Sequence, residues 1–226
     1  MKNISRLAIN LLTCTGAGLS AWAIISASQG NIREAWILLG VTVLIDGIDG
    51  TLIRVLEIKD VLPQFDGDRL DEYADLLTFV VAPVLIGWLT NVIPLSVPGI
   101  ITGILIIALS CLQFSHEHSK TERAFWGFPS YWNVVIFYGW GFGVTGCWMI
   151  GVCLVLCATL FAPIPFVYPS RFDVFRTLTI VLALIWTVMI FTYLVMSAPP
   201  TWLLPASFFY PVYYTVISFG LYPYMK

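Results

Sequence analysis

Charged residues are scarce in this sequence. Only 11% of its 226 residues are Asp, Glu, Lys or Arg, whereas a soluble domain carries about 25%. Apolar residues make up 59% of the chain, and the mean hydropathy is +0.89. Because so few charges cannot cover a water-facing surface, the composition excludes an ordinary soluble globule and indicates a protein surrounded by lipid.

A basic excess and paired cysteines are also missing. The formal net charge is −2, so the chain offers no basic face to a phosphate backbone, and we expect no nucleic-acid partner. The five cysteines all lie within apolar runs, and no two of them have the C-x-x-C spacing of a metal or redox motif. We interpret them as reduced thiols that face lipid or the protein core.

Apolar segments long enough to cross a bilayer are present along the whole chain. We expect single spans at 7–28, 35–54, 70–92, 97–114, 173–196 and 201–223. The remaining segment, 130–163, is too long for one span and contains four glycines between positions 139 and 146. Because glycine weakens a helix interior, we expect this segment to split near 141–146 into two helices.

The sequence therefore predicts an all-α integral membrane protein, a polytopic bundle of about eight transmembrane helices that forms one domain over residues 1–226. The basic residues predict its orientation. With the N-terminus inside, ten of the eleven Lys and Arg residues fall in cytoplasmic segments and only Arg33 lies outside. Both termini are then expected on the cytoplasmic side.

Carboxylates are concentrated in one short stretch. Nine of the thirteen acidic residues lie between positions 46 and 75. Asp46 and Asp49 directly follow an apolar run, and Asp75 directly precedes another, so these acids lie near or within the membrane boundary, where ionisable groups are costly and usually functional. Asp46 and Asp49 share a helix face at three residues apart, as do Asp71 and Asp75 at four.

Two adjacent antiparallel helices can aim these four carboxylates at one point. Four like charges require cations between them, and hard divalent ions such as Mg²⁺ or Mn²⁺ prefer oxygen ligands. The pattern therefore predicts one or two divalent cations held by Asp46, Asp49, Asp71 and Asp75. A proton relay, or acids that merely end two helices, are the alternatives.

The whole stretch resembles a family signature. It reads Asp46-x2-Asp49-Gly50-x3-Arg54-x12-Gly67-x3-Asp71-x3-Asp75. This is similar to the signature of the CDP-alcohol phosphotransferase family, in which two acids, a glycine and an arginine are followed by a second glycine and two further acids. Two departures are Ile53, where the family usually has alanine, and the gap of twelve residues before Gly67, which is longer than usual.

Further features resemble the bacterial phosphatidylcholine synthase branch of that family. They are the long loop before Gly67, the eight predicted spans, the cytoplasmic segment 125–133, and Thr13-x2-Gly16-x-Gly18 in the first helix. The resemblance implies transfer of the phosphatidyl group of CDP-diacylglycerol to choline, with release of CMP. It also implies a homodimer in a bacterial inner membrane, with the active site facing the cytoplasm.

The resemblance assigns roles residue by residue. It implies two metal ions on the four aspartates, with Asp75 also acting as the general base for the choline hydroxyl. It implies contacts to CDP-diacylglycerol from the following residues: Thr13, Asp49, Gly50, Arg54, Gly67 and Asp71. Arginine suits phosphate because of its fixed fork of donors, and glycine lets a ligand approach the backbone.

A quaternary ammonium has no hydrogen-bond donor on nitrogen, so its recognition depends on aromatic faces and negative charge. The segment 125–140 is rich in aromatic residues. The residues that we name as candidates for binding choline are Tyr73, Trp126, Tyr131, Trp132 and Asn133. The alternative for the aromatic residues is a belt at the membrane interface.

Two other functions remain open. The acceptor could be serine, glycerol phosphate or inositol phosphate, although a phosphorylated acceptor needs several basic groups, and in the two signature helices only Arg54 and Arg69 supply them. A cation transporter could also use four aspartates. It would be expected to show inverted repeats, and neither half of this chain mirrors the other.

Overall fold

The fold is a bundle of helices with one short β-ribbon, known from a computed structural model that describes residues 2–55, 66–116, 124–167 and 175–220. Its helices are α1 (Lys2–Ser28), α2 (Ile32–Val55), α3 (Gly67–Asp75), the π-helix η1 (Leu76–Val81), α4 (Ala82–Leu89), α5 (Val97–Phe114), α6 (Trp132–Phe142), α7 (Gly146–Thr159), α8 (Arg176–Val195), α9 (Leu203–Ser207) and α10 (Phe209–Gly220). Its strands are β1 (Ala124–Trp126) and β2 (Pro165–Val167).

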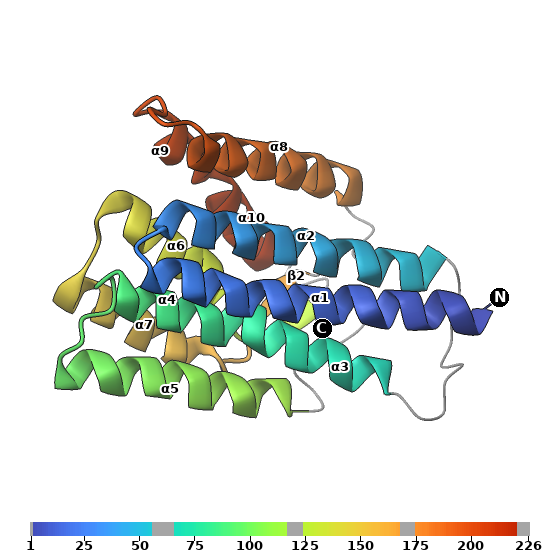
Figure 1. Cartoon of the computed structure of the whole chain (residues 1–226). Coiled ribbons are helices and arrows are strands. Elements are labelled where there is room, and N and C mark those ends of the chain that lie inside the picture. The colour runs from blue at the N-terminus through green and yellow to red at the C-terminus, as the bar shows by residue number, and fades with distance from the viewer. Residues whose placement is uncertain (1, 56–65, 117–123, 168–174, 221–226) are drawn as a thin grey trace.

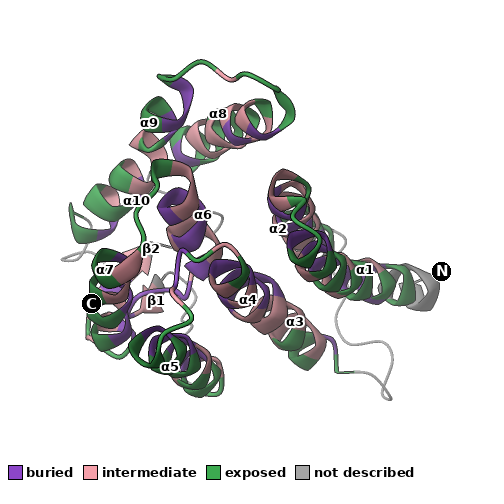
Figure 2. Cartoon of the chain, turned by 60° about the vertical axis from the view of Figure 1, so that its left-hand side comes forward, coloured by how far each residue is buried: buried purple, intermediate pink, exposed green. Residues whose placement is uncertain are grey.

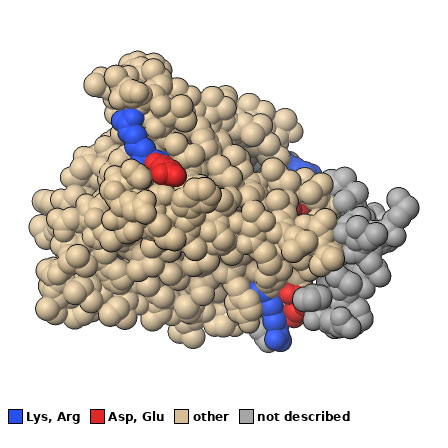
Figure 3. Space-filling model, in the orientation of Figure 1, with Lys and Arg blue, Asp and Glu red and all other residues tan. Residues whose placement is uncertain are grey.

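Five helices in the described residues are long and apolar enough to cross a membrane. They comprise residues 7–28, 32–52, 67–89, 97–114 and 176–195. The surface agrees with this: Figure 3 shows a face that is almost free of charged side chains. The protein is therefore an integral membrane protein. Helices α6, α7, α9 and α10 are also apolar but shorter than the roughly 20 residues that a straight span needs.

The two helices that carry the acidic residues, α2 and α3, both pack against α1. Helices α1 and α2 form a hairpin that turns at Gly30 (φ 86°), and α1 also contacts the continuous helix formed by α3, η1 and α4. These helices and α5 run along one common direction in Figure 1, whereas α8 lies against α2 on the outside of the bundle. Buried residues gather on α4 and α6, at the centre of the bundle (Figure 2).

The long apolar segment splits where its glycines predict. Helix α6 ends at Phe142 and α7 begins at Gly146. Between them Gly143 takes a left-handed conformation with φ 68°, and Gly146 follows with φ 66°. Both values are costly for other residues, so the glycines cause the break, and the predicted division near 141–146 is confirmed.

The β-ribbon departs from the purely helical prediction. Strands β1 and β2 pair antiparallel, with Phe125 opposite Phe166 and Trp126 opposite Pro165. Three-residue strands have too few positions to show a period of two, and their partners lie far apart in the chain, so hydropathy gives no sign of them. The ribbon ties the segment after α5 to the segment after α7.

A buried amide organises the turn that follows β1. Gln113 Nε2, on α5, donates to the carbonyl oxygens of Phe128 (2.8 Å) and Leu160 (3.0 Å). Its other amide atom, Oε1, accepts from the Ser130 hydroxyl at 2.6 Å. Because unpaired buried polar groups are costly, these bonds fix the path of residues 127–131 against α5 and α7.

Gly127 gives a test of how tightly this turn is packed. Its φ is 84°, and a Cβ placed on it would lie 1.8 Å from the carbonyl oxygen of Leu160. We expect Gly127→Ala to lower the unfolding free energy by more than the roughly 1–3 kcal/mol that a strained backbone residue costs. Thermal unfolding of the purified protein in detergent measures the effect. The matched control is Gly151→Ala in α7, where a Cβ meets nothing within 4 Å; equal melting temperatures for the two variants would contradict the prediction.

Candidate active site

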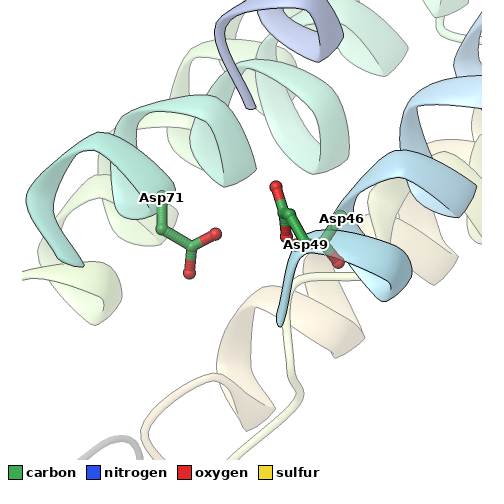
Figure 4. A group of neighbouring side chains, drawn as sticks. All are labelled: Asp46, Asp49 and Asp71. Carbon is green, nitrogen blue, oxygen red and sulfur yellow. The ribbon is translucent and has the colours of Figure 1, made fainter. Parts of the chain in front are cut away.

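Three of the four predicted metal ligands lie together. Asp46 and Asp49 come from the last turns of α2, and Asp71 comes from α3. One carboxylate oxygen from each lies within 4.8 Å of the other two, and Figure 4 shows the three side chains gathered between the two helices. The spacing of three along α2 puts both of its acids on the face that meets α3. Such a group of oxygens suits a hard divalent cation.

Asp49 is the most constrained of the three. Its side chain is only 2% exposed, and its Oδ2 accepts a hydrogen bond of 2.6 Å from the Thr13 hydroxyl on α1. Its Oδ1 is buried and has no hydrogen-bond partner in the described residues. A buried carboxylate oxygen without a partner is costly, and a cation between Asp49, Asp46 and Asp71 would satisfy it. The residues present therefore fit a metal ion.

The fourth predicted ligand, Asp75, is not a member of this group of three, and its role as a ligand stays a prediction. It is half-buried, four residues beyond Asp71 on the same helix, and it is not among the carboxylates that converge within 4.8 Å. It ends α3, and the π-helix η1 begins at the next residue. Because π-turns are rare and often occur at functional sites, the change of helix type beside Asp75 draws attention to this position.

A buried hydrogen bond fixes the π-helix to α1. The hydroxyl groups of Thr78 in η1 and Ser20 in α1 lie 3.0 Å apart. Together with the bond from Thr13 to Asp49, it gives α1 one polar contact to each of the two acid-bearing helices. The sequence alone points to Thr13 but not to Ser20 or Thr78, because a serine or threonine within an apolar helix gives no sign of its partner on another helix.

The remaining signature residues lie around the three aspartates. Gly50 follows Asp49 in α2, and a Cβ placed on it would meet nothing within 4 Å. Gly67 is the buried first residue of α3, and Asp66 caps that helix by accepting from the backbone N–H of Arg69. Arg54 lies in the last turn of α2, and its side chain lies outside the described residues. The open space at Gly50 is compatible with a ligand beside the aspartates.

Comparison with known proteins decides the family. No protein-family model matches the chain. The phosphatidylcholine synthase of Brucella melitensis is 32% identical over 195 residues, which cover 84% of this chain and 70% of that protein. The phosphatidylcholine synthase of Borreliella burgdorferi is 33% identical over 193 residues, covering 82% and 80%. This chain belongs to the phosphatidylcholine synthase family. The family member of Agrobacterium fabrum is 28% identical over 88% of this chain and 83% of its own.

In this member of the phosphatidylcholine synthase family, the five residues proposed for choline lie in different surroundings. Tyr73 is 67% exposed on α3. Trp132 is fully buried, and its indole N–H donates to Ser110 Oγ at 2.9 Å. Asn133 Oδ1 accepts from the backbone N–H of Val134 at 2.9 Å. Trp126 is half-buried on β1. The role of these four residues in binding choline stays a prediction.

Tyr131 differs from the other four. It is half-buried at the start of α6, with its ring centroid 5.9 Å from Phe79 and 6.0 Å from Tyr214. Phe79 lies in η1 and Tyr214 in α10. The structure therefore brings an aromatic residue from the predicted segment next to the helix that carries Asp71 and Asp75.

Proposed function

We propose that this chain synthesises phosphatidylcholine by transferring the phosphatidyl group of CDP-diacylglycerol to choline, with release of CMP. Two findings together support the proposal. Relatives over most of the chain are named phosphatidylcholine synthases. The signature acids Asp46, Asp49 and Asp71 converge, and one carboxylate oxygen of Asp49 is buried with no hydrogen-bond partner among the residues that the structure describes. The second finding carries the chemistry, because the three carboxylates could hold a divalent cation, which would neutralise the charge of a pyrophosphate group.

The signature also supports membership of the wider CDP-alcohol phosphotransferase family. In this proposal Asp46, Asp49, Asp71 and Asp75 hold two Mn²⁺ or Mg²⁺ ions. Bound there, the ions would neutralise charge on the transferring phosphoryl group and on the leaving CMP. Thr13 keeps Asp49 oriented through its 2.6 Å hydrogen bond.

The reaction is a single displacement at phosphorus. The choline oxygen forms a bond to the phosphorus of the phosphatidyl group, and the bond from that phosphorus to the CMP oxygen breaks. Asp75 accepts the hydroxyl proton, because an alcohol is a poor nucleophile at neutral pH and a positioned carboxylate lowers the barrier. Gly50 and Gly67 leave room for the nucleotide, and Arg54 pairs with a phosphate oxygen.

The basic residues favour a cytoplasmic site. Ten of the eleven Lys and Arg residues fall on the side of the predicted topology that holds both termini. Asp46, Asp49 and Asp71 lie at the ends of α2 and α3 that belong to this side. We therefore place the site at the cytoplasmic face of a bacterial inner membrane, in a single domain over residues 1–226, and the family resemblance adds a homodimer.

An acceptor assay tests the function. Purified protein is given CDP-diacylglycerol and Mn²⁺ or Mg²⁺, with choline, serine, glycerol 3-phosphate or inositol phosphate in separate reactions. We expect release of CMP and formation of phosphatidylcholine with choline alone, and loss of both on addition of EDTA. Release of CMP with another alcohol would contradict the acceptor but not the site, whereas no release from folded protein with any of them would contradict the reaction.

A further inference from the structure

Four aromatic rings from four different elements form one cluster, which begins on the helix that carries Asp71 and Asp75. Tyr131 lies between Phe79 of η1 and Tyr214 of α10. Phe166 of β2 stacks on Tyr214, with the two ring centroids 6.0 Å apart. Phe79 and Tyr214 are 9% and 8% exposed, whereas Tyr131 remains half-buried. The two outer rings of Phe79 and Tyr214 are therefore buried, and the ring of Tyr131 between them is partly accessible.

The cluster begins one helical turn beyond the proposed base. Phe79 follows Asp75 by four residues on one continuous helix, which is about one turn of the π-helix η1. Asp71, Asp75 and Phe79 therefore succeed one another at intervals of four along that helix. In choline only two carbon atoms separate the hydroxyl oxygen from the quaternary nitrogen, so a site for the nitrogen has to lie within about one turn of the group that accepts the hydroxyl proton.

The turn that precedes Tyr131 is strained and is held in place by hydrogen bonds. Ser130, directly before it, has φ 55°, a left-handed conformation that is costly for serine. The residue is fully buried, and its hydroxyl is hydrogen-bonded to Gln113 Oε1 at 2.6 Å and to Ser110 Oγ at 3.1 Å. Strained residues held by many bonds are typical of sites that need a fixed geometry. Packing an aromatic ring against a helix requires no such strain.

We propose that Phe79, Tyr131 and Tyr214 form the pocket for the trimethylammonium group of choline, an inference that rests on the function proposed above. A quaternary ammonium is attracted to aromatic faces, and Tyr131 lies between the two other rings, inclined to them by 52° and 56°. The carboxylate of Asp75 supplies negative charge one turn away. Phe166 supports Tyr214 from behind, and their ring planes are inclined by only 27°.

Kinetics of single variants test the pocket. We expect Tyr131→Leu and Tyr214→Leu each to raise the KM for choline about tenfold while leaving the KM for CDP-diacylglycerol unchanged, because a partly desolvated cation–π contact is worth a factor of this order. Tyr131→Phe keeps the ring and should recover most of the lost affinity. The matched control is Tyr210→Leu, an aromatic residue of the same helix as Tyr214 that instead stacks on Trp186, 5.4 Å away.

A second measurement needs no variant. The uncharged analogue 3,3-dimethylbutan-1-ol has the shape of choline without its charge. We expect the wild-type protein to use choline at least about tenfold more efficiently, as kcat/KM, and we expect Tyr131→Leu to reduce this preference. Equal use of the two alcohols by the wild type would overturn the pocket, even if the leucine variants failed to fold.

The results of these measurements distinguish an error in the proposed pocket from an error in the proposed function. A wild-type protein that makes phosphatidylcholine, with leucine variants that keep the choline KM of the wild type, would overturn the pocket alone. An equal rise in the KM values of both substrates would also overturn the pocket alone, since it indicates a general disturbance. A folded wild-type protein that makes no phosphatidylcholine would overturn the proposed function and the pocket with it.

Discussion

Asp49→Asn is expected to abolish phosphatidylcholine formation without weakening the fold. The asparagine oxygen can still accept from the Thr13 hydroxyl, which now lies 2.6 Å from Oδ2. The charge that faces Asp46 and Asp71 is lost, so the group of three becomes a poor cation site. The loss of turnover should exceed the roughly 10–100-fold that follows removal of a residue that only orients a metal ligand.

The same substitution should have opposite effects on stability with and without metal. In EDTA the wild-type protein keeps the buried Asp49 Oδ1, which has no partner in the described part of the chain, and neutral asparagine reduces that cost. We therefore expect the variant to melt at the same temperature as the wild type, or higher, in EDTA. Adding Mn²⁺ should raise the melting temperature of the wild type only, because a ligand stabilises the state that binds it.

Asp68→Asn is the matched control for Asp49→Asn. Asp68 lies on α3 as Asp71 does, but it is exposed and outside the converging group. Its variant should keep both turnover and the response to Mn²⁺. Normal turnover by Asp49→Asn, or stabilisation of that variant by Mn²⁺ to the same extent as the wild type, would show that Asp49 holds no metal.

The sequence predicts those parts of the site that depend on local geometry. Asp46 and Asp49 share a face because they are three residues apart on one helix, and the two helices are close neighbours in the chain. Their convergence with Asp71 therefore follows from spacing alone. The break between α6 and α7 is also local, because Gly143 and Gly146 supply the left-handed backbone that ends one helix and begins the next.

The parts that the sequence does not predict depend on contacts between distant segments. The β-ribbon, the bond between Ser20 and Thr78, and the contact of Tyr131 with Tyr214 each join residues that are far apart in the chain. Hydropathy gives an average value for each such segment, but it does not show which other segment it contacts. Hydropathy does not predict helix length either. Helices α6 and α7 are apolar like helices that cross the membrane, yet the break leaves each of them shorter than the bilayer core requires.

Asp75→Asn is expected to remove catalysis while leaving the three converging metal ligands, Asp46, Asp49 and Asp71, in place. Asp75 lies outside the three carboxylates that converge within 4.8 Å, so its replacement should change the Mn²⁺ requirement less than Asp71→Asn does. Its proposed task is to accept the choline proton, and loss of such a group typically costs about 10²–10⁴-fold in rate. Measuring kcat, the choline KM and the Mn²⁺ concentration for half-maximal activity in both variants separates the two roles.

The pH dependence of the residual activity gives a second test of the role of Asp75. Without a base on the protein, the hydroxyl proton must leave to solvent, so the residual activity of Asp75→Asn should rise with pH more steeply than that of the wild type. Glu72→Gln, which changes a half-buried acid on the same helix outside the converging group, should keep wild-type kcat. If Asp75→Asn retains its turnover, another group accepts the proton. If instead it raises the Mn²⁺ requirement as much as Asp71→Asn does and excess Mn²⁺ restores kcat, Asp75 acts only as a metal ligand and another group is the base.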